Sequence, residues 1–267
     1  MKKRFMAGMA SSILFLAGAA EAKDLCSIVV DAASGKVIHQ KGTACDERIA
    51  PASTFKIPLS LMGYDSGYLS DTALPSLPYH EGDAAWIASW KEDTNPTAWM
   101  KNSVVWYSQR LTEWLGEERF RNYVESFSYG NRDVSGDPGK NNGLTRAWLS
   151  SSLKISPLEQ ADFLQKLVNR RLPVSTHAYD MTERLVSVGS LADGWEAYGK
   201  TGMGYPVKAD GSRDEKRPFG WFVGWAKQKE RTVVFVHIVQ DDKKEKTYAS
   251  LRAKEGILKE LPSILKQ

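Results

Sequence analysis

The sequence is poor in cysteine and histidine, with only two and four of these residues among 267. It contains no cysteine cluster and no His-Glu-x-x-His motif, so no metal is expected and a zinc enzyme is not indicated. The Gly-x-Ser-x-Gly motif of α/β-hydrolases is also missing, and the histidines lie in unrelated contexts, which leaves a Ser-His-Asp triad poorly supported. His237 falls inside the apolar run 233–239, where a hydrogen-bonded strand residue is favoured over a ligand.

An excess of charge of one sign is absent too, since 36 basic and 32 acidic side chains leave a formal charge of +4. So small and evenly spread a charge does not favour nucleic acid as a partner. The chain also lacks repeats and long linkers rich in proline, glycine and serine. With 42% apolar and 25% charged residues, the composition is that of a soluble globular protein and excludes intrinsic disorder.

Long hydrophobic runs are missing except at the N-terminus. Residues 2–4 are basic, residues 5–20 are apolar or small, and residues 20–22 have the small-x-small pattern that signal peptidase accepts. A membrane anchor is the alternative, but the run is short for a bilayer and is interrupted by glycine and serine. We therefore expect a cleaved signal peptide at residues 1–22 and a mature protein that is periplasmic or secreted, without membrane contact.

The two cysteines, Cys26 and Cys45, flank a predicted hairpin. Segments 27–31 and 37–39 have strand character, and a turn between them would bring the cysteines near each other. A disulfide bond here would close a loop of about 20 residues and add about 3 kcal/mol of stability. Two free buried thiols are the alternative, because the sequence does not supply the separation of the Cα atoms.

Strand patterns occur at both ends of the chain, and helical patterns lie between them. The C-terminal segments 196–201, 219–226 and 232–240 are rich in aromatic and β-branched residues, and a helical pattern follows at 247–261. In the middle, Ser156-Pro157-Leu158-Glu159 has the sequence of a helix N-cap with a capping box. We predict an α/β fold of the α+β type in one domain, 23–267. Its antiparallel sheet comes from both termini, about 23–50 and 190–267, with flanking helices and a mostly helical insertion at about 51–189.

One candidate for chemistry is a serine that uses lysine as its base. Ser53 and Lys56 stand at positions i and i+3, which share one face of a helix. The Ser-x-x-Lys pattern is weak alone, because it recurs at Ser151 and Ser263. Only the first copy is followed by Ser103-Val104-Val105 and by Lys200-Thr201-Gly202 on a predicted strand, a combination found in serine acyltransferases that recognise penicillin.

The ordered set of motifs resembles class D (oxacillinase-type) β-lactamases. The motifs are Pro51-Ala52-Ser53-Thr54-Phe55-Lys56, Ser103-Val104-Val105, Tyr129-Gly130-Asn131, Trp148 within 148–156, Lys200-Thr201-Gly202 and 219–225. The resemblance covers nearly all of the chain after residue 22. It implies the fold of the penicillin-recognising serine acyltransferases, hydrolysis of the β-lactam amide bond of penicillin-type antibiotics, and resistance to them.

The resemblance also implies roles for individual residues. Ser53 would be the nucleophile, and Lys56, carboxylated by carbon dioxide, would be the general base for acylation and deacylation, with no other cofactor. Trp148 would hold the carbamate through its indole N–H, although a purely structural core tryptophan is the alternative. Ser103 would pass a proton to the β-lactam nitrogen, and Val104 would keep the surroundings of the lysine dry.

The substrate-binding residues are inferred from the same resemblance: Lys200, Thr201, Gly202, Met203, Arg252 and Val104. Lys200, Thr201 and Arg252 would bind the substrate carboxylate, and the backbone N–H groups of Ser53 and Met203 would form the oxyanion hole. Arg252 has a plainer interpretation as one more solvated basic residue, which is how we interpret Lys254 and Lys259 on the same helix. Gly130 and Asn131 are interpreted as a helix-ending turn.

Two other functions remain open besides a hydrolase. A β-lactam sensor domain would be acylated and stay acylated, but such sensors are tethered to a membrane and this chain shows no further span after its signal. A peptidoglycan DD-peptidase is disfavoured by Val105, where penicillin-binding proteins mostly carry an amide. The substrate profile depends on loops such as 205–218, and the oligomeric state is either a monomer or a homodimer.

Overall fold

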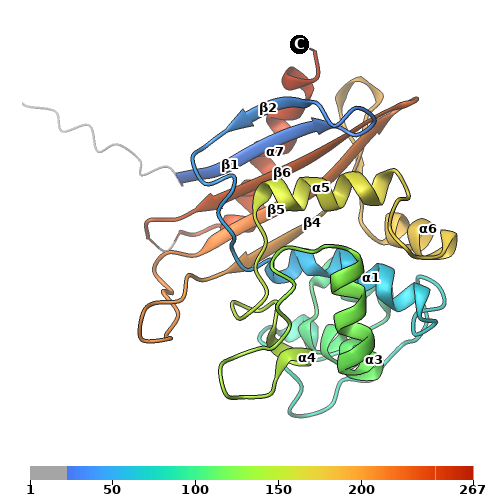
Figure 1. Cartoon of the computed structure of the whole chain (residues 1–267), viewed down its shortest axis with the longest axis vertical. Helices are drawn as coiled ribbons and strands as arrows, with labels where there is room; N and C mark the ends of the chain where they lie inside the picture. Colours follow the sequence, from blue (N-terminus) through green and yellow to red (C-terminus); the bar gives the residue numbers. More distant parts are fainter. Residues whose placement is uncertain (1–22, 244, 267) are drawn as a thin grey trace, which may run out of the picture.

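The computed structural model describes residues 23–243 and 245–266; the predicted signal peptide lies outside the described residues. A six-stranded antiparallel sheet, in the order β2-β1-β6-β5-β4-β3, joins strands from both ends of the chain (Figure 1). The strands are β1 Lys23–Asp31, β2 Val37–Lys41, β3 Ser187–Ser190, β4 Glu196–Gly204, β5 Phe219–Gln228 and β6 Arg231–Gln240. The predicted fold class is therefore confirmed. Only β3 was not predicted, because it is a short edge strand that carries a glycine and is mostly exposed.

The helices lie between β2 and β3, apart from η3, which lies between β3 and β4, and α7, which follows β6. They are α1 Lys56–Asp65, α2 Pro96–Asn102, α3 Val105–Ser126, α4 Gly143–Arg146, α5 Pro157–Val168, α6 Thr176–Leu185 and α7 Ala249–Ile264, with the short 3-10 helices η1 Ala52–Phe55, η2 Ala88–Trp90 and η3 Ala192–Gly194. Helix α5 lies across one face of the sheet and α7 covers the other (Figure 1). Within the described residues, no helix is both long and apolar enough to cross a bilayer.

Two hydrophobic cores follow from the alternation of side chains along the strands. On β5, Trp221, Val223 and Trp225 belong to the larger core, shared with the helices between β2 and β3. Phe222, one residue out of phase, belongs to the smaller core under α7. The apolar stripe of α7 closes that core with Ala249, Ala253, Ile257, Leu261 and Ile264. On this sheet, odd and even positions of a strand therefore meet different environments.

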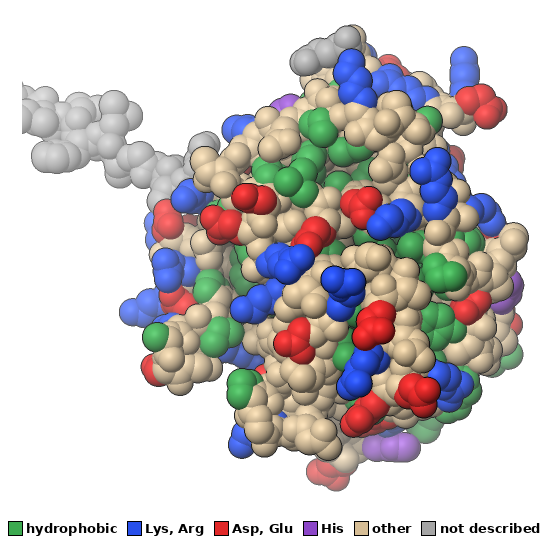
Figure 2. Space-filling model, in the orientation of Figure 1, with side chains coloured by type: hydrophobic (Ala, Val, Ile, Leu, Met, Phe, Trp, Pro, Cys, Tyr) green, Lys and Arg blue, Asp and Glu red, His purple; other side chains and the backbone are tan. Residues whose placement is uncertain are grey.

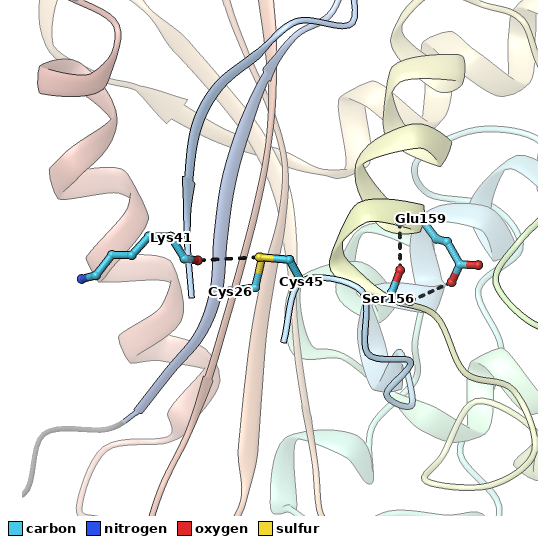
Figure 3. The surroundings of a disulfide bond; sticks show 5 residues. All are labelled: Cys26, Lys41, Cys45, Ser156 and Glu159. Carbon is cyan, nitrogen blue, oxygen red and sulfur yellow. Dashed lines mark hydrogen bonds between the residues drawn. A yellow bond between two sulfur atoms is a disulfide. The ribbon is translucent and has the colours of Figure 1, made fainter. Parts of the chain in front are cut away.

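A disulfide bond connects β1 to the segment that leads into the helical region. Cys26 and Cys45 are bonded, with Cα atoms 5.0 Å apart, so the structure selects the disulfide over two free thiols (Figure 3). Figure 3 also shows the predicted capping box at the start of α5, where Ser156 and Glu159 each bond to the backbone of the other. The Leu158 N–H donates to the Cys45 carbonyl at 3.0 Å, which joins these two features.

His237 on β6 is a hydrogen-bonded strand residue, as its sequence context favours. Its Nδ1 lies 2.8 Å from the Ala253 carbonyl on α7, and its Nε2 lies 3.1 Å from a carboxylate oxygen of Asp24 on β1. The other Asp24 oxygen accepts from Lys41 at 3.1 Å. The hydrogen bond from His237 is the main reason why the pKa of Asp24 falls from 3.8 to about 2.

Asp24 should therefore stabilise the fold in a pH-dependent way. Its folded pKa lies below its unfolded pKa, so its contribution is complete above about pH 4 and is lost as the pH falls towards 2. Because the side chain is about one-third exposed, we expect Asp24→Asn to cost only about 1 kcal/mol at pH 7. Urea unfolding of both proteins at pH 7 and pH 3 measures this. A stability gap that is the same at both pH values would contradict the assignment.

Positive and negative side chains are interspersed over the face shown in Figure 2. This agrees with the near balance of charge in the composition, from which we inferred no nucleic-acid partner.

Candidate active site

Ser53 and Lys56 lie within one helical turn at the junction of η1 and α1. The Lys56 N–H donates to the Ser53 carbonyl, and Lys56 then begins α1. Ala52, just before the serine, has φ 50°, a left-handed conformation that is uncommon for a residue other than glycine. Its N–H donates to the Trp148 carbonyl at 3.1 Å, so the turn that presents Ser53 is held by a segment about 100 residues away. Ser53 remains partly exposed, whereas Lys56 is buried.

Strand β4 lies directly against this turn. A Cβ atom on Gly202 would stand 2.9 Å from the Pro51 carbonyl oxygen and 3.0 Å from the Thr54 nitrogen. The glycine therefore permits close approach of the two backbones. From β5, Trp221 donates its indole N–H to the Ala50 carbonyl at 3.1 Å and holds the chain just before η1.

We expect Gly202→Ala to lower kcat/KM at least about tenfold and to cost about 1–3 kcal/mol of stability, because the added methyl must separate β4 from η1. Gly67→Ala is the control: a Cβ there meets nothing, although φ 79° makes the substitution strained. It should lose stability and keep kcat/KM per folded molecule. Equal kinetic losses in the two variants, measured by steady-state kinetics and thermal unfolding, would refute the close-approach argument.

The second serine meets the strand lysine. Ser103 ends α2 in a left-handed conformation, φ 59°, which turns the chain into α3. Its Oγ accepts a hydrogen bond of 2.5 Å from the Lys200 Nζ, although the residues are 97 positions apart. Lys200 also donates to the Thr201 carbonyl and hydroxyl at 3.1 and 3.2 Å. The structure thus brings together the motifs Ser103-Val104-Val105 and Lys200-Thr201-Gly202.

Lys56 and Trp148 share an unusual condition. Both are almost completely buried, and neither the Lys56 Nζ nor the Trp148 Nε1 has a hydrogen-bond partner. Phe55, the neighbour of Lys56, stacks on the Trp148 ring with centroids 5.5 Å apart, and Val104 is fully buried in the same core. Buried donors without partners are rare in folded proteins and cost about 1–3 kcal/mol each.

Burial sets the protonation of both lysines. The pKa of Lys56 falls well below its ordinary value of 10.5, mainly because burial penalises the ammonium form and also because the charge of Lys200 repels it. The pKa of Lys200 is lowered to about 7, mainly by burial and also by the charge of Lys254 on α7. Burial therefore favours the neutral amine form of Lys56, and a pKa of about 7 leaves Lys200 divided between its two forms at neutral pH.

Arg252 lies in an ion pair on α7. Its guanidinium donates to the Thr247 carbonyl and to the carboxylate of Asp241, which is only 2% exposed. The α7 cation whose charge acts on Lys200 is Lys254. The sequence interpretation treated Lys254 as a solvated residue, and in the structure its side chain is half-buried.

Tyr129 contacts η1 directly through Phe55 and indirectly through Gln160. Its ring contacts Phe55 edge-on at 5.2 Å, and its hydroxyl donates to Gln160 at 3.4 Å, while Gln160 donates to the Thr54 hydroxyl at 3.0 Å. Gly130, with φ 54°, approaches the Lys154 carbonyl too closely for a Cβ, which fits the predicted turn. Gln160 had no sequence signal beyond its place on the predicted helix.

Met203, whose backbone N–H is the second expected donor of the oxyanion hole, lines a cavity of about 290 Å³. It is lined by residues from the end of β4, from the 205–218 loop and from the start of α7, among them Tyr205, Pro218 and Tyr248. In the part of the chain that the structure describes, no group of three or more potential ligand residues could hold a metal ion.

Comparison with known proteins decides the family. Residues 25–263 match the penicillin-binding protein transpeptidase domain. The chain is 44% identical to β-lactamase OXA-9 of Klebsiella pneumoniae, over 90% of this chain and 88% of that protein. The chain belongs to the class D β-lactamase family. β-Lactamase OXA-1 of Escherichia coli is 36% identical, over 89% of this chain and 84% of its own length.

A solved class D β-lactamase, OXA-427, has the same fold, with a TM-score of 0.86 and 52% identity over 91% of this chain and 99% of the other. The predicted family and enzyme class, a serine β-lactamase that acts on cyclic amides, are confirmed.

Proposed function

We propose that this class D β-lactamase hydrolyses penicillin-type antibiotics through an acyl-enzyme on Ser53, with a carboxylated Lys56 as general base, and so confers resistance. The observation that carries the proposal is the buried, neutral, unpartnered amine of Lys56 one turn from Ser53. A second hydroxyl group, that of Ser103, is hydrogen-bonded to the side chain of Lys200. Both residues belong to the ordered motifs that also contain Ser53 and Lys56.

The residues around Lys56 fit a carbamate. A neutral amine can attack carbon dioxide, forming a nitrogen–carbon bond and releasing one proton, whereas an ammonium group cannot. The product is an anion, which the unpartnered Trp148 N–H can hold and the nearby charge of Lys200 can stabilise. When present, the carbamate supplies a general base at neutral pH.

Other residues of the protein carry out the remaining steps of the proposed reaction. Ser53 Oγ gives its proton to the carboxylated side chain of Lys56 and bonds to the β-lactam carbonyl carbon, while the backbone N–H groups of Ser53 and Met203 stabilise the developing oxyanion. Ser103 delivers a proton to the ring nitrogen as the amide bond breaks, and Lys200 can replenish it through their hydrogen bond. Lys200 and Thr201 hold the substrate carboxylate. Water then gives a proton to the side chain of Lys56 and adds to the acyl carbon, and Ser53 Oγ leaves as it takes that proton back from Lys56.

Steady-state hydrolysis of a chromogenic cephalosporin tests this function. The purified protein should turn over many equivalents of substrate, because the carboxylated Lys56 that serves as base for acylation also serves as base for deacylation. A burst of one equivalent followed by no further product would overturn the hydrolase proposal and favour the sensor or the DD-peptidase.

We also propose that the protein acts outside the cytoplasm, as a mature chain of residues 23–267. The basic and apolar segments at residues 2–20 support export, and the Cys26–Cys45 disulfide suits an oxidising compartment. The intact mass of the exported protein should correspond to a chain that begins at Lys23. A retained N-terminus would contradict cleavage.

A further inference from the structure

Three buried polar side chains next to η1 form a continuous series of hydrogen bonds, which we call the Gln160 network. It consists of Tyr129, Gln160 and Thr54, and it ends on the Pro51 carbonyl. The Tyr129 hydroxyl lies 3.4 Å from Gln160 Oε1, and Gln160 Nε2 lies 3.0 Å from Thr54 Oγ1. Thr54 Oγ1 in turn lies 2.7 Å from the Pro51 carbonyl oxygen. The proposed catalytic steps use neither Gln160 nor Thr54, so the network needs another explanation.

The hydrogen bonds of the Gln160 network can run in only one direction, because the network ends on a carbonyl. A carbonyl oxygen only accepts, so the Thr54 hydroxyl donates its proton to Pro51. The Thr54 oxygen can then only accept from Gln160, which turns the amide Nε2 towards Thr54 and leaves Oε1 for Tyr129. Burial raises the pKa of Tyr129, so its hydroxyl keeps the proton that this last bond requires. Every donor and acceptor role in the network is therefore fixed.

The network acts on the peptide group between Pro51 and Ala52, which directly precedes Ser53. The carbonyl of this group accepts from the Thr54 hydroxyl at 2.7 Å and from the Thr54 N–H at 3.2 Å. Its N–H donates to the Trp148 carbonyl at 3.1 Å, so both ends of the peptide group are held. Ala52 needs this support because its left-handed conformation, φ 50°, is strained for a residue with a Cβ. Rotation of the peptide group would relax Ala52 and would move the N–H and Oγ of Ser53 together.

Local structure places Gln160 for this contact. The capping box sets the start of α5, so Gln160 falls in the first turn of that helix, where its N–H donates to the Ser156 carbonyl at 2.8 Å. Two backbone hydrogen bonds between Ile49 and Ile155, at 3.0 and 2.9 Å, join the segments that lead into η1 and α5. Helix α5 therefore cannot shift along η1 without breaking this bridge.

We propose that Gln160 is a positioning residue for the reaction: through Thr54 it fixes the peptide group that orients the Oγ and the N–H of Ser53. The inference rests on the proposed function, since it requires Ser53 to be the acylated residue. The Pro51 carbonyl oxygen would also lie 2.9 Å from a Cβ atom on Gly202. Its orientation therefore affects the spacing between η1 and β4, which carry the two N–H donors expected in the oxyanion hole.

The test measures acylation of Ser53 by a penicillin, followed by mass spectrometry over a range of penicillin concentrations. This separates the rate constant of acylation from the dissociation constant of the initial complex. We expect the acylation rate constant to fall about tenfold in Gln160→Met, which removes the amide, and about 30-fold in Thr54→Val, which removes the hydroxyl. The dissociation constants should stay within about twofold of the wild type. Thr54→Ser keeps the hydroxyl and should stay within about threefold of the wild-type rate constant.

Gln165→Met is the matched control, because Gln165 lies on the same helix and donates its amide N–H to the Ala32 carbonyl at 3.0 Å instead of to η1. It should lose stability in thermal unfolding and keep the acylation rate constant per folded molecule. A variant that combines Gln160→Met with Thr54→Val should react no more slowly than Thr54→Val alone, because Gln160 acts through Thr54. Where Gln160→Met does not fold, the comparison of Thr54→Val with Thr54→Ser tests the same network.

Three results would overturn the proposal. They are acylation rate constants that are unchanged in Gln160→Met or Thr54→Val, losses that multiply in the combined variant, and a loss that appears in the dissociation constant instead of the rate constant. A wild type that is not acylated on Ser53 would refute this inference together with the proposed function. A wild type that is acylated but does not deacylate would refute only the proposed hydrolase, because the acylation rate constants of the variants would still decide the role of Gln160.

Discussion

Lys56→Ala should lower the steady-state kcat for β-lactam hydrolysis at least about 10³-fold, because it removes the base proposed for both chemical steps. Lys56 is the one lysine within a turn of Ser53, and burial lowers the pKa of its amine well below 10.5. The variant should also fold normally, since alanine removes a buried amine that has no hydrogen-bond partner. Steady-state kinetics with a chromogenic cephalosporin measure the effect.

Lys154→Ala is the matched control, because Lys154 ends a second Ser-x-x-Lys sequence but is exposed. It should retain wild-type kcat. Added bicarbonate should not rescue Lys56→Ala, because no amine remains to react with carbon dioxide. If Lys56→Ala kept more than about a tenth of the wild-type kcat, the base would have to be another group.

Trp148→Phe should lower kcat about 10²-fold, and bicarbonate should restore part of the loss. Phenylalanine keeps an aromatic ring against Phe55 but removes the indole N–H that we propose to hold the carbamate. The carbamate would then lose carbon dioxide more readily, and a higher bicarbonate concentration would shift the equilibrium back. Titration of kcat against bicarbonate checks this result.

Trp225→Phe is the control for packing. Trp225 is also fully buried with an unpartnered Nε1, and it stacks on Tyr198 with centroids 5.5 Å apart, but it lies on β5 and carries no proposed role. It should lose stability without any dependence of kcat on bicarbonate. If both variants responded to bicarbonate alike, the effect would be one of core packing and not of the Trp148 N–H.

The sheet was predictable because its C-terminal strands are long and rich in β-branched and aromatic residues. The start of α5 was predictable because a capping box marks it. The four-residue β3 was not, since its mostly exposed side chains give no alternation. The disulfide required a Cα separation that only the folded chain provides.

In the active site, the motifs identified Ser53, Lys56, Ser103 and Lys200 as candidates, but their meeting depends on tertiary contacts. The 2.5 Å hydrogen bond from Lys200 to Ser103 spans 97 residues and has no local signal. The contacts of the α7 cations could not be predicted from the sequence either. Arg252 and Lys254 are two positions apart, and the rotation of the helix against the sheet determines that Arg252 meets Asp241 and Lys254 meets the Phe222 ring.

The central claim is that Lys56 carries the base as a carbamate. The most direct measurement is ¹³C NMR of the protein in ¹³C-labelled bicarbonate at neutral pH. The wild type and Lys154→Ala should each show one carbamate resonance per chain, and Lys56→Ala should show none. A fully active wild type without that resonance, or a resonance that persists in Lys56→Ala, would contradict the account.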